Sequence, residues 1–449
     1  MVDAVRKLSA ALNRPLDLAS LAFFRIAFGL ALLALCARFF NHGWIEAEYQ
    51  TPRHFFHYWG FEWVRPWPGN GMYVHYAVMA AAAACIALGV AYRPACVVFA
   101  LSFSYAHLCD KANYLNHYYF ISLVSGLMAL MPLDREASLR VYFAPEQRRV
   151  SARAWVLYLL RFQVGVVYVF GGIGKLGRDW LLHAEPLRIW LSANVELPLL
   201  GRFFEERAVA LAFSWAGLIF DLSVVPLLLW PRTRKLAYVA VVAFHVLTAL
   251  LFKIGMFPWL MMLAATLFFE PGWPRPLLDR LRAARPPKIR DDEPRVGGYQ
   301  LLLLSLYVAA QLLLPLRHLL YPGNTLWSEE GFRFAWRVML IEKSGELELQ
   351  VVDRLGRRST VSPRRYLTAF QARMAATQPD MILELAHIVA RDYEQRGAGP
   401  VQVFADARVS FNGRASAPLI APTVDLARQS DGLAHKTWIL PAPSADPEF

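Results

Sequence analysis

Long apolar stretches separated by short polar segments recur along the first 320 residues of the chain. Most of them reach about 18 residues, the length an α-helix needs to cross a bilayer. The one at 95–109 is the shortest and is interrupted by polar residues. The pattern predicts about nine transmembrane helices, near 20–40, 73–92, 95–109, 115–133, 154–174, 207–230, 235–252, 254–270 and 300–320.

The pattern changes after the "YPGN" at 321–324. The segment "GELELQVVD" (345–353) alternates polar and apolar residues as a half-buried strand does, and a second strand is predicted before Asn412-Gly413, a hairpin-turn pair. Helical periodicity occupies 363–397 between them. We therefore expect a polytopic α-helical membrane domain over 1–320 and a mixed α/β, strand-containing extracytoplasmic domain over 321–449.

Two further segments carry specific expectations. The Pro- and Arg-rich stretch at 274–299 is predicted to be an inside loop between the last two spans. The stretch "LLHAEPLRIWLSANVELPLLGRFF" (181–204) is amphipathic, and we expect it to lie along the membrane interface as a helix.

The composition agrees with a membrane protein, because 56% of the 449 residues are hydrophobic and 18% are charged. The formal net charge is +12. Arginine and lysine concentrate in alternate short loops, which is the positive-inside pattern. It predicts a cytoplasmic N-terminus and a periplasmic or luminal C-terminal domain. Since topology accounts for the basic excess, nucleic acid is not an expected partner. The basic clusters lie at 6–14, 93, 135–153, 232–235 and 275–295.

Several common kinds of site have no support in the sequence. No HExxH, GxSxG, Walker or Rossmann motif is present. The four cysteines do not form a CxxC motif, and all lie in or beside apolar stretches, so neither a metal site nor a disulfide framework is expected. They are Cys36, Cys85, Cys96 and Cys109.

Five ionisable residues interrupt the apolar stretches: Arg25, His117, Arg161, Asp221 and His245. Such residues face the interior of a helical bundle, where they serve function or pair with one another. The residues alone leave both alternatives open. Asp221 needs a partner in either case, and we expect Arg25 or Arg161. His245 is either a hydrogen-bonded core histidine or part of a cofactor site.

The segment "VYVFGGIGKLGRDW" (167–180) brings a lysine to the end of an apolar stretch. Lys175 can extend to the membrane interface, as lysines at span ends do. Alternatively, it can be a partly desolvated amine that acts as a base. Tyr168 lies seven residues earlier, on the same helix face if the helix continues through Gly171, Gly172 and Gly174. These glycines make continuity doubtful, but they allow a backbone or a flat ligand to approach closely.

A second polar pair opens the fourth apolar stretch, within "CDKANYLNHYYFISL" (109–123). The predicted topology places Asn116 and His117 on the same side of the membrane as Lys175. Together they offer the hydrogen-bond donors and acceptors that could hold the oxygens of a quinol. Helix capping or contacts between helices are the alternative.

Several motifs together resemble the vitamin K-dependent γ-glutamyl carboxylase family. The resemblance rests on their order along the chain, from about 18 to 440, and no single motif is specific. It suggests a shortened homologue of bacterial type. The motifs are "LASLAFFRIAFG", "DKANYLNHYYF", "VVYVFGGIGKLGRDW", "FDLSVVPLLLW", "FHVLTALLFKIGMF" and "WSEEGFRFAWRVML".

The resemblance implies a carbon–carbon lyase of the peptidyl-glutamate 4-carboxylase type. Such an enzyme couples epoxidation of reduced vitamin K, or of a menaquinol, by O2 to carboxylation of protein glutamate with CO2. It implies that Lys175 is the base that deprotonates the quinol and that Asn116 and His117 support the reaction at the quinone. Tyr168 and His245 are further candidate cofactor-binding residues. The expected partners are a quinol, a Glu-containing protein or peptide, and membrane lipid.

The resemblance also points to substrate-binding residues. The segment at 327–340 matches the glutamate-binding region of the family and keeps its aromatic pattern, which includes Trp336. Arg333 and Arg337 stand where animal enzymes have other residue types, and they can hold a carboxylate or be solvated. Arg373 falls near a family arginine at the active site.

Two departures from the animal enzymes qualify these expectations. The match ends soon after "HKTWILP", whereas animal carboxylases continue with a region that helps to recognise a propeptide. The segment after 320 has no cysteine for the disulfide that ties the two parts of the animal enzyme together. Quinol oxygenation is therefore better supported than processive carboxylation. Two alternatives stay open: a quinol epoxidase with another acceptor or none, and a non-catalytic membrane scaffold.

Overall fold

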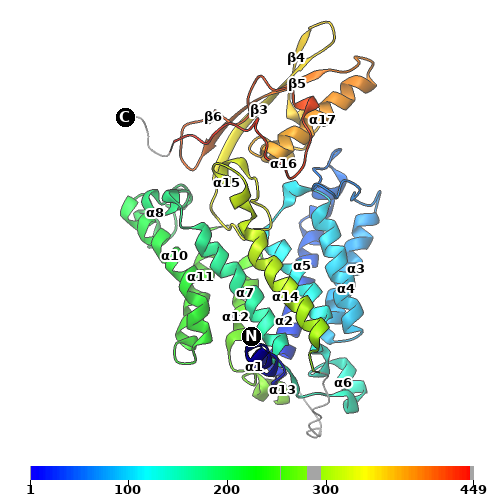
Figure 1. Cartoon of the computed structure of the whole chain (residues 1–449), viewed down its shortest axis with the longest axis vertical. Coiled ribbons are helices and arrows are strands. Elements are labelled where there is room, and N and C mark those ends of the chain that lie inside the picture. The colour runs from blue at the N-terminus through cyan, green and yellow to red at the C-terminus, as the bar shows by residue number, and fades with distance from the viewer. Residues whose placement is uncertain (1, 253, 281–294, 445–449) are drawn as a thin grey trace.

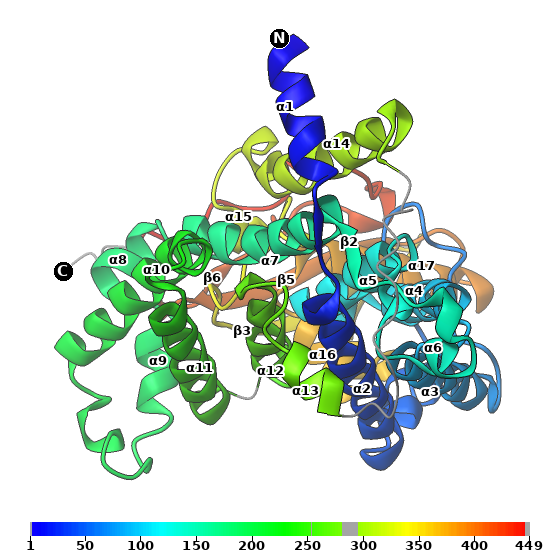
Figure 2. The ribbon, with the colours of Figure 1, turned by 90° about the horizontal axis from the view of Figure 1, so that it is seen from below.

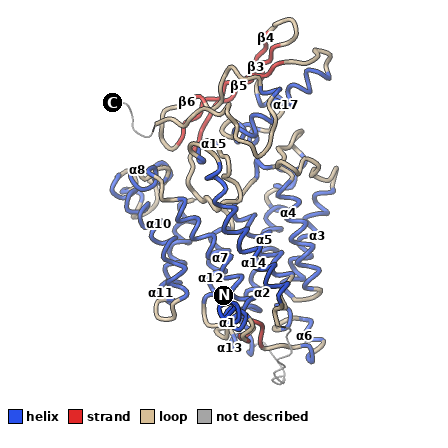
Figure 3. The backbone as a smooth tube through the Cα atoms, in the orientation of Figure 1, coloured by secondary structure: helices blue, strands red, loops and turns tan. Residues whose placement is uncertain are grey.

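The chain forms a bundle of helices with a small sheet-containing unit at one end. The computed structural model describes residues 2–252, 254–280 and 295–444. The N-terminus lies at the end of the bundle that is opposite the sheet (Figure 1). Figure 3 shows the same division, with the long helices in one part and the sheet in the other.

Each predicted apolar stretch contains a helix. These helices are α2 (Ala19–Asn41), α3 (Gly71–Leu88), α4 (Tyr92–Leu108), α5 (Asn116–Ala129), α7 (Ala154–Gly174), α10 (Arg207–Leu229), α11 (Arg234–Leu251), α12 (Phe257–Ala265) and α14 (Gly298–Leu313). The shorter helices are α1 (Val2–Leu12), α6 (Leu139–Phe143), α8 (Arg178–His183), α9 (Leu187–Ser192), α13 (Arg275–Arg280) and α15 (Thr325–Ser328).

Six helices in the described part of the chain are long and apolar enough to cross a membrane. They are α2, α3, α7, α10, α11 and the continuous helical segment Gly298–Leu320, which contains α14. Helices α4, α5 and α12 are shorter. The structure therefore indicates an integral membrane protein with six candidate spans, and the number nine stays a prediction.

The bundle has two sides. Seen from below, α9, α10 and α11 lie on one side, α3, α4 and α6 lie on the other, and α2 and α12 lie between them (Figure 2). Helix α2 packs on α3, α4 packs on α5, and α7 packs on α10. A short antiparallel pair, β1 (Pro15–Asp17) and β2 (Ser151–Arg153), joins the starts of α2 and α7.

The expectation that Arg25 or Arg161 pairs with Asp221 is wrong. Arg25 is fully buried and donates to main-chain carbonyl groups, which belong to Ile86, Ala87, Leu133 and Ala137. Arg161 donates to the carbonyl groups of Leu267 and Phe269. Carbonyl groups at the ends of helices have no partner within their own helix, so a buried guanidinium can satisfy several of them at once.

The C-terminal part is a four-stranded antiparallel sheet in the order β4-β3-β5-β6. Its strands are β3 (Lys343–Val352), β4 (Arg358–Val361), β5 (Gln402–Phe411) and β6 (Ala417–Pro418). Helices α16 (Ala369–Ala375) and α17 (Pro379–Gln395) pack on the sheet, and apolar residues of α17, β3 and β5 share one core. The predicted hairpin is confirmed: Asn412 and Gly413 have positive φ of 47° and 78° between β5 and β6.

The prediction of an interfacial helix over 181–204 is wrong for most of that segment. Only α9, the end of α8 and the single 3₁₀ turn Gly201–Phe203 are helical there, and Pro186 and Pro198 interrupt the rest. The Trp190 indole donates a 2.6 Å hydrogen bond to Glu342, so this segment packs against the C-terminal part. The loop predicted at 274–299 lies largely outside the described residues.

Candidate active site

Lys175 follows the last residue of α7 and turns into the bundle. Its Nζ donates to Asp221 Oδ2 at 2.7 Å and to the Gly171 carbonyl at 3.2 Å. The amine also lies 5.2 Å from the centre of the Trp180 ring. Only 5% of Lys175 and 6% of Asp221 is exposed. Lys175 therefore does not extend along the membrane boundary, but forms a buried ion pair.

Two glycines of α7 bring Asp221 to Lys175. A Cβ on Gly172 would lie 2.6 Å from Leu222 on α10, closer than real side chains approach. A Cβ on Gly171 would lie 3.5 Å from Asp221 Oδ2. Helix α7 continues through both residues to Gly174. The glycines thus serve close packing of α7 on α10, which places the carboxylate beside the amine.

The ion pair lines a mostly apolar cavity of about 370 Å³, which we call the Lys175 cavity. Aromatic and aliphatic side chains of α10 and α11, such as Phe213 and Phe244, form much of its wall. Tyr168 and His245 also line it, and the Tyr168 hydroxyl lies 2.8 Å from His245 Nε2. His245 Nδ1 is buried and has no hydrogen-bond partner among the described residues. The cavity therefore combines apolar walls with a few polar groups.

Asn116 and His117 line an adjoining cavity of about 630 Å³, the His117 cavity. The two cavities share four lining residues, Ile254, Phe257, Val338 and Met339. Asn116 donates to the Arg337 carbonyl at 2.9 Å and accepts from Tyr114 at 3.0 Å. Within 2–252, 254–280 and 295–444, no side chain or carbonyl pairs with the His117 ring nitrogens. The structure thus brings Lys175, Tyr168 and His245 close to Asn116 and His117.

Two of the four residues between the cavities, Val338 and Met339, belong to a strained segment. Phe334, Trp336 and Met339 have φ of 60°, 55° and 56°, a left-handed conformation that non-glycine residues rarely adopt. Trp336 is fully buried and stacks on Tyr119, with ring centres 4.8 Å apart. Tyr114 also accepts a hydrogen bond from the Phe334 main chain at 2.7 Å. Backbone strain of this kind clusters at functional sites.

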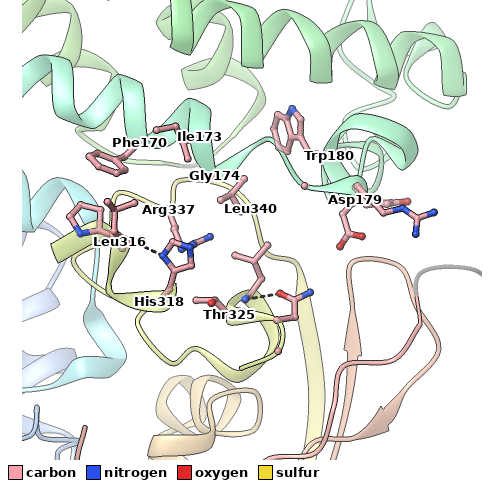
Figure 4. A pocket seen from close by; sticks show the side chains of 18 of the residues that line it. Phe170, Ile173, Gly174, Asp179, Trp180, Leu316, His318, Thr325, Arg337 and Leu340 are labelled. Atoms are coloured by element: carbon pink, nitrogen blue, oxygen red, sulfur yellow. Dashed lines mark hydrogen bonds between the residues drawn. The ribbon is translucent and has the colours of Figure 1, made fainter. Parts of the chain in front are cut away.

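Arg337 extends into a third cavity, of about 550 Å³, beyond the end of α7 (Figure 4). Trp180 lines both this cavity and the Lys175 cavity. Gly174 and Leu340 line the third cavity and pack closely, because a Cβ on Gly174 would lie 2.8 Å from Leu340 Cδ1. Burial, together with Arg317, lowers the pKa of Arg337. Arg337 is therefore close to the Lys175 cavity but does not line it.

Arg333 and Arg373 are not brought to Lys175. They line a fourth cavity, of about 370 Å³, at the junction of the bundle and the C-terminal part. Arg333 donates to Asp380 at 2.7 Å and is fully engaged by acidic and amide groups of that junction. Arg373 lies over the Phe370 ring, 5.4 Å from its centre.

Partly buried ion pairs connect Lys111, in the loop before Asn116, and His57 to α17. Lys111 lies 3.1 Å from Asp380 and 3.2 Å from Glu384, and His57 lies 2.8 Å from Glu384. Burial acts to lower the pKa of Lys111, but Asp380 and Glu384 raise it above its usual value. Burial acts to raise the pKa of Asp380, yet Arg333 and Lys111 bring it well below 3.8. The pairs therefore hold both groups charged.

We expect acid to weaken this junction through Asp380. Because its folded-state pKa is lowered, Asp380 stabilises the folded chain above about pH 4, and this stabilisation is lost as pH falls through the lowered pKa. The melting temperature of the wild type should fall on acidification from about pH 5 to about pH 3. Asp380→Asn should melt lower at pH 5 but show a smaller fall. Asp406→Asn, at an exposed position of β5, is the matched control. Equal falls in wild type and Asp380→Asn would contradict the assignment.

The sequence did not identify Asp221 as the partner of Lys175. The available signal was the Gly-Gly pair of α7, since small residues mark the face on which another helix packs closely.

Among the residues described, no group of three or more His, Cys, Asp or Glu side chains is arranged to hold a metal ion.

Comparison with known proteins matches two families in succession. Residues 13–273, more than half of the chain, match the HTTM domain family. Residues 298–445 match the family described as "Vitamin K-dependent gamma-carboxylase, lumenal domain". No solved structure matches the chain. The first match contains Lys175, Asp221, Asn116 and His117, and the second contains the segment that separates the two cavities.

Proposed function

The chain belongs to the vitamin K-dependent γ-glutamyl carboxylase family, and from this premise we propose that it couples quinol epoxidation by O2 to carboxylation of protein or peptide glutamate with CO2. The observation that carries the proposal is a buried Lys175–Asp221 pair in an apolar cavity that adjoins Asn116 and His117. Reduced vitamin K or a menaquinol is the proposed cofactor.

The side chains that line the Lys175 cavity are chemically suited to bind a quinol. Its walls are largely apolar and aromatic, as the flat ring and prenyl tail of a quinone require. Its polar groups are few, and His245 Nδ1 still lacks a hydrogen-bond partner in the described part of the chain. Lys175, Tyr168 and His245 would hold the quinol. When bound, the quinol supplies, with O2, the strong base that the carboxylation of glutamate needs.

Lys175 is the proposed base that takes the quinol proton at Nζ. A lysine must be neutral to accept a proton, and the 2.7 Å hydrogen bond to Asp221 offers a route for the ammonium proton to reach the carboxylate. In a cavity with little water, a neutral amine and carboxylic acid lie closer in free energy to the ion pair than they do in solution. Asp221 is thus a positioning residue that acts through Lys175.

Asn116 and His117 are proposed to act from the adjoining side. Asn116 is held by Tyr114 and by the Arg337 carbonyl, so its amide has a fixed orientation. The His117 ring keeps its nitrogens available to a ligand. Apolar residues of the shared wall exclude water between the two cavities. Arg337, Arg333, Arg373 and Trp336 stay proposed substrate-binding residues, with Arg337 the nearest of the three arginines to the Lys175 cavity.

The same proposal assigns a location to each part. We propose that residues 1–320 span the membrane, with the N-terminus in the cytoplasm, and that 321–449 form a periplasmic or luminal domain. The N-terminus and the sheet lie at opposite ends of the molecule, which supports this orientation (Figure 1).

Separate assays of epoxide and of fixed radioactive CO2 test the proposed function. The purified chain, given a reduced quinone, O2, CO2 and a Glu-containing peptide, should form both products. Epoxide without carboxylation would favour a quinol epoxidase with another acceptor. The absence of both products, with vitamin K hydroquinone and with menaquinol, would favour a non-catalytic scaffold.

His117→Ala is expected to slow epoxide formation with little effect on the amount of folded protein. The His117 ring contacts the cavity and has no hydrogen bond to other described residues, so its removal leaves no unpaired group behind. Loss of one catalytic hydrogen-bonding group typically lowers the rate by about 100-fold. Turnover and expression should be measured side by side, with His42→Ala as an exposed control. A variant that mainly fails to accumulate would indicate a structural role.

A further inference from the structure

The His117 cavity contains two ionisable side chains that have no role in the proposed chemistry. Arg38 comes from the last turn of α2, and Glu48 comes from the short π-helical turn Glu46–Gln50. Arg38 Nε and Glu48 Oε2 are both buried, and neither has a hydrogen-bond partner among the described residues. Buried polar groups without partners are uncommon in folded proteins, and a bound ligand, ion or water is one way in which such groups are satisfied.

Arg38 is a cation without a counterion in the described part of the chain. No carboxylate lies within ion-pair distance of it there, and its guanidinium lies 5.3 Å from the centre of the Trp44 ring. Leaving a guanidinium half-buried and unpaired costs free energy that an anion can recover. The aromatic ring holds the guanidinium from one side, so its edge is available to a planar anion.

Glu48 does not supply the missing charge. Burial, and then the nearby Asp110, raise the pKa of Glu48 to about 8. At neutral pH its carboxyl group is therefore largely protonated and can donate a hydrogen bond. Arg38, Glu48 and His117 can all donate hydrogen bonds into the cavity. Its polar side therefore suits a group that only accepts hydrogen bonds, such as a carboxylate.

The position of these groups connects them to the reaction. The His117 cavity meets the Lys175 cavity at the wall formed by Val338, Met339, Ile254 and Phe257. Gly255, with φ of +63°, lies next to the His117 ring, where a Cβ would be 3.9 Å from Nε2. A glycine at this position keeps space beside the imidazole. The cavity of about 630 Å³ has room for an extended amino-acid side chain and part of its backbone.

We propose that Arg38 and Glu48 form a carboxylate-binding subsite in the His117 cavity, occupied by the glutamyl side chain of the acceptor. This inference rests on the proposed function, because it identifies where the acceptor is held relative to Lys175. Arg38 supplies the charge and fixes the carboxylate, Glu48 donates a second hydrogen bond, and the carbons of the side chain extend toward the shared wall. Arg38 thereby selects glutamate over glutamine.

A binding experiment that needs no turnover tests the subsite. Two short peptides that differ only in Glu or Gln at one position are titrated into the purified full chain in lipid nanodiscs, without quinol. The wild type should bind the Glu peptide more tightly. Arg38→Gln should weaken binding of the Glu peptide by about 10- to 100-fold, the usual range for a charge-assisted hydrogen bond, and bind both peptides alike. Arg38→Lys keeps the charge without the forked donors, so its loss should be smaller.

Arg53→Gln is the matched control, because Arg53 is exposed in the loop that follows Glu48. It should bind both peptides as the wild type does. Glu48→Gln keeps a donor at the same position and should weaken the Glu peptide only slightly, whereas Glu48→Ala should weaken it further. In turnover, Arg38→Lys should raise the KM for the Glu peptide while the KM for the quinol stays the same.

The outcomes separate this inference from the proposed function. Equal discrimination between Glu and Gln peptides in wild type and folded Arg38→Gln would overturn the subsite, even if the wild type forms epoxide and fixes CO2. Arg38-dependent binding of bicarbonate or inorganic phosphate without discrimination between the peptides would also overturn it, in favour of a small-anion site. If Arg38→Gln does not fold, the other two variants decide. The subsite would be overturned if both Arg38→Lys and Glu48→Ala preferred the Glu peptide over the Gln peptide as strongly as the wild type does. Failure of the wild type to oxidise any quinol would instead overturn the proposed function, while the binding result still decides the subsite.

Discussion

Lys175→Ala should abolish epoxide formation, with a loss of at least about 100-fold, because a positioned base contributes about 10²- to 10⁴-fold. Lys175 Nζ lines the Lys175 cavity and is held by Asp221 and the Gly171 carbonyl. No other amine lines this cavity in the described part of the chain. Epoxide formation in nanodiscs, at matched amounts of folded protein, measures the loss.

A small exogenous amine should partly restore the Lys175→Ala reaction, because the truncation leaves room for it beside Asp221. Lys235→Ala is the matched control, since Lys235 is exposed at the start of α11, the helix that carries His245. It should leave turnover unchanged. Undiminished turnover by Lys175→Ala would contradict the assignment of Lys175 as the base.

Asp221→Asn should lower the free energy of unfolding by about 3–5 kcal/mol, the usual cost of removing one partner of a buried ion pair. The substitution leaves the Lys175 ammonium buried beside a neutral amide, and only 5% of Lys175 is exposed. Epoxide formation should fall as well, because the carboxylate that accepts the amine proton is lost. The melting temperature and the turnover of the folded fraction measure the two effects separately.

The double variant Lys175→Met/Asp221→Leu distinguishes stability from chemistry. Replacing a buried ion pair by apolar residues of similar volume is often neutral or stabilising. We therefore expect the double variant to recover most of the stability that Asp221→Asn loses and to remain without epoxidase activity. A folded Asp221→Asn variant with wild-type turnover would show that the carboxylate has no part in the proton transfer.

The junction between the bundle and the C-terminal part is held by non-covalent contacts among the described residues. All four cysteines are free thiols, and none follows Cys109 in the sequence. The ion pairs of Lys111 with Asp380 and Glu384 are among these contacts, and Lys111 is close to Asn116 in the chain. The same loop hydrogen-bonds the strained segment at 334–337, so the ion pairs also position the wall between the two cavities.

Local patterns predicted the helices and the hairpin, because both depend on neighbouring residues. Each apolar stretch gave a helix, and Asn412-Gly413 gave the turn that its positive φ requires. The interfacial helix at 181–204 was mispredicted, because its amphipathic pattern hid two prolines that restrict helix formation. The predicted number of nine spans is not confirmed by helix length, since α4, α5 and α12 are short.

Sequence patterns were enough to predict a membrane protein of the carboxylase family and to select Lys175, Asn116 and His117 as the leading candidate site residues. Hydropathy and motif order are properties of the chain, and they need no knowledge of what packs on what. The packing of the helices was needed to show that Asp221 pairs with Lys175 and that Arg25 and Arg161 bind carbonyl groups. It was also needed to show that Arg38 and Glu48 line the same cavity as His117. A buried charged group pairs with the group that helix packing places within about 3 Å of it. Which group that is does not depend on the distance between the two residues along the sequence.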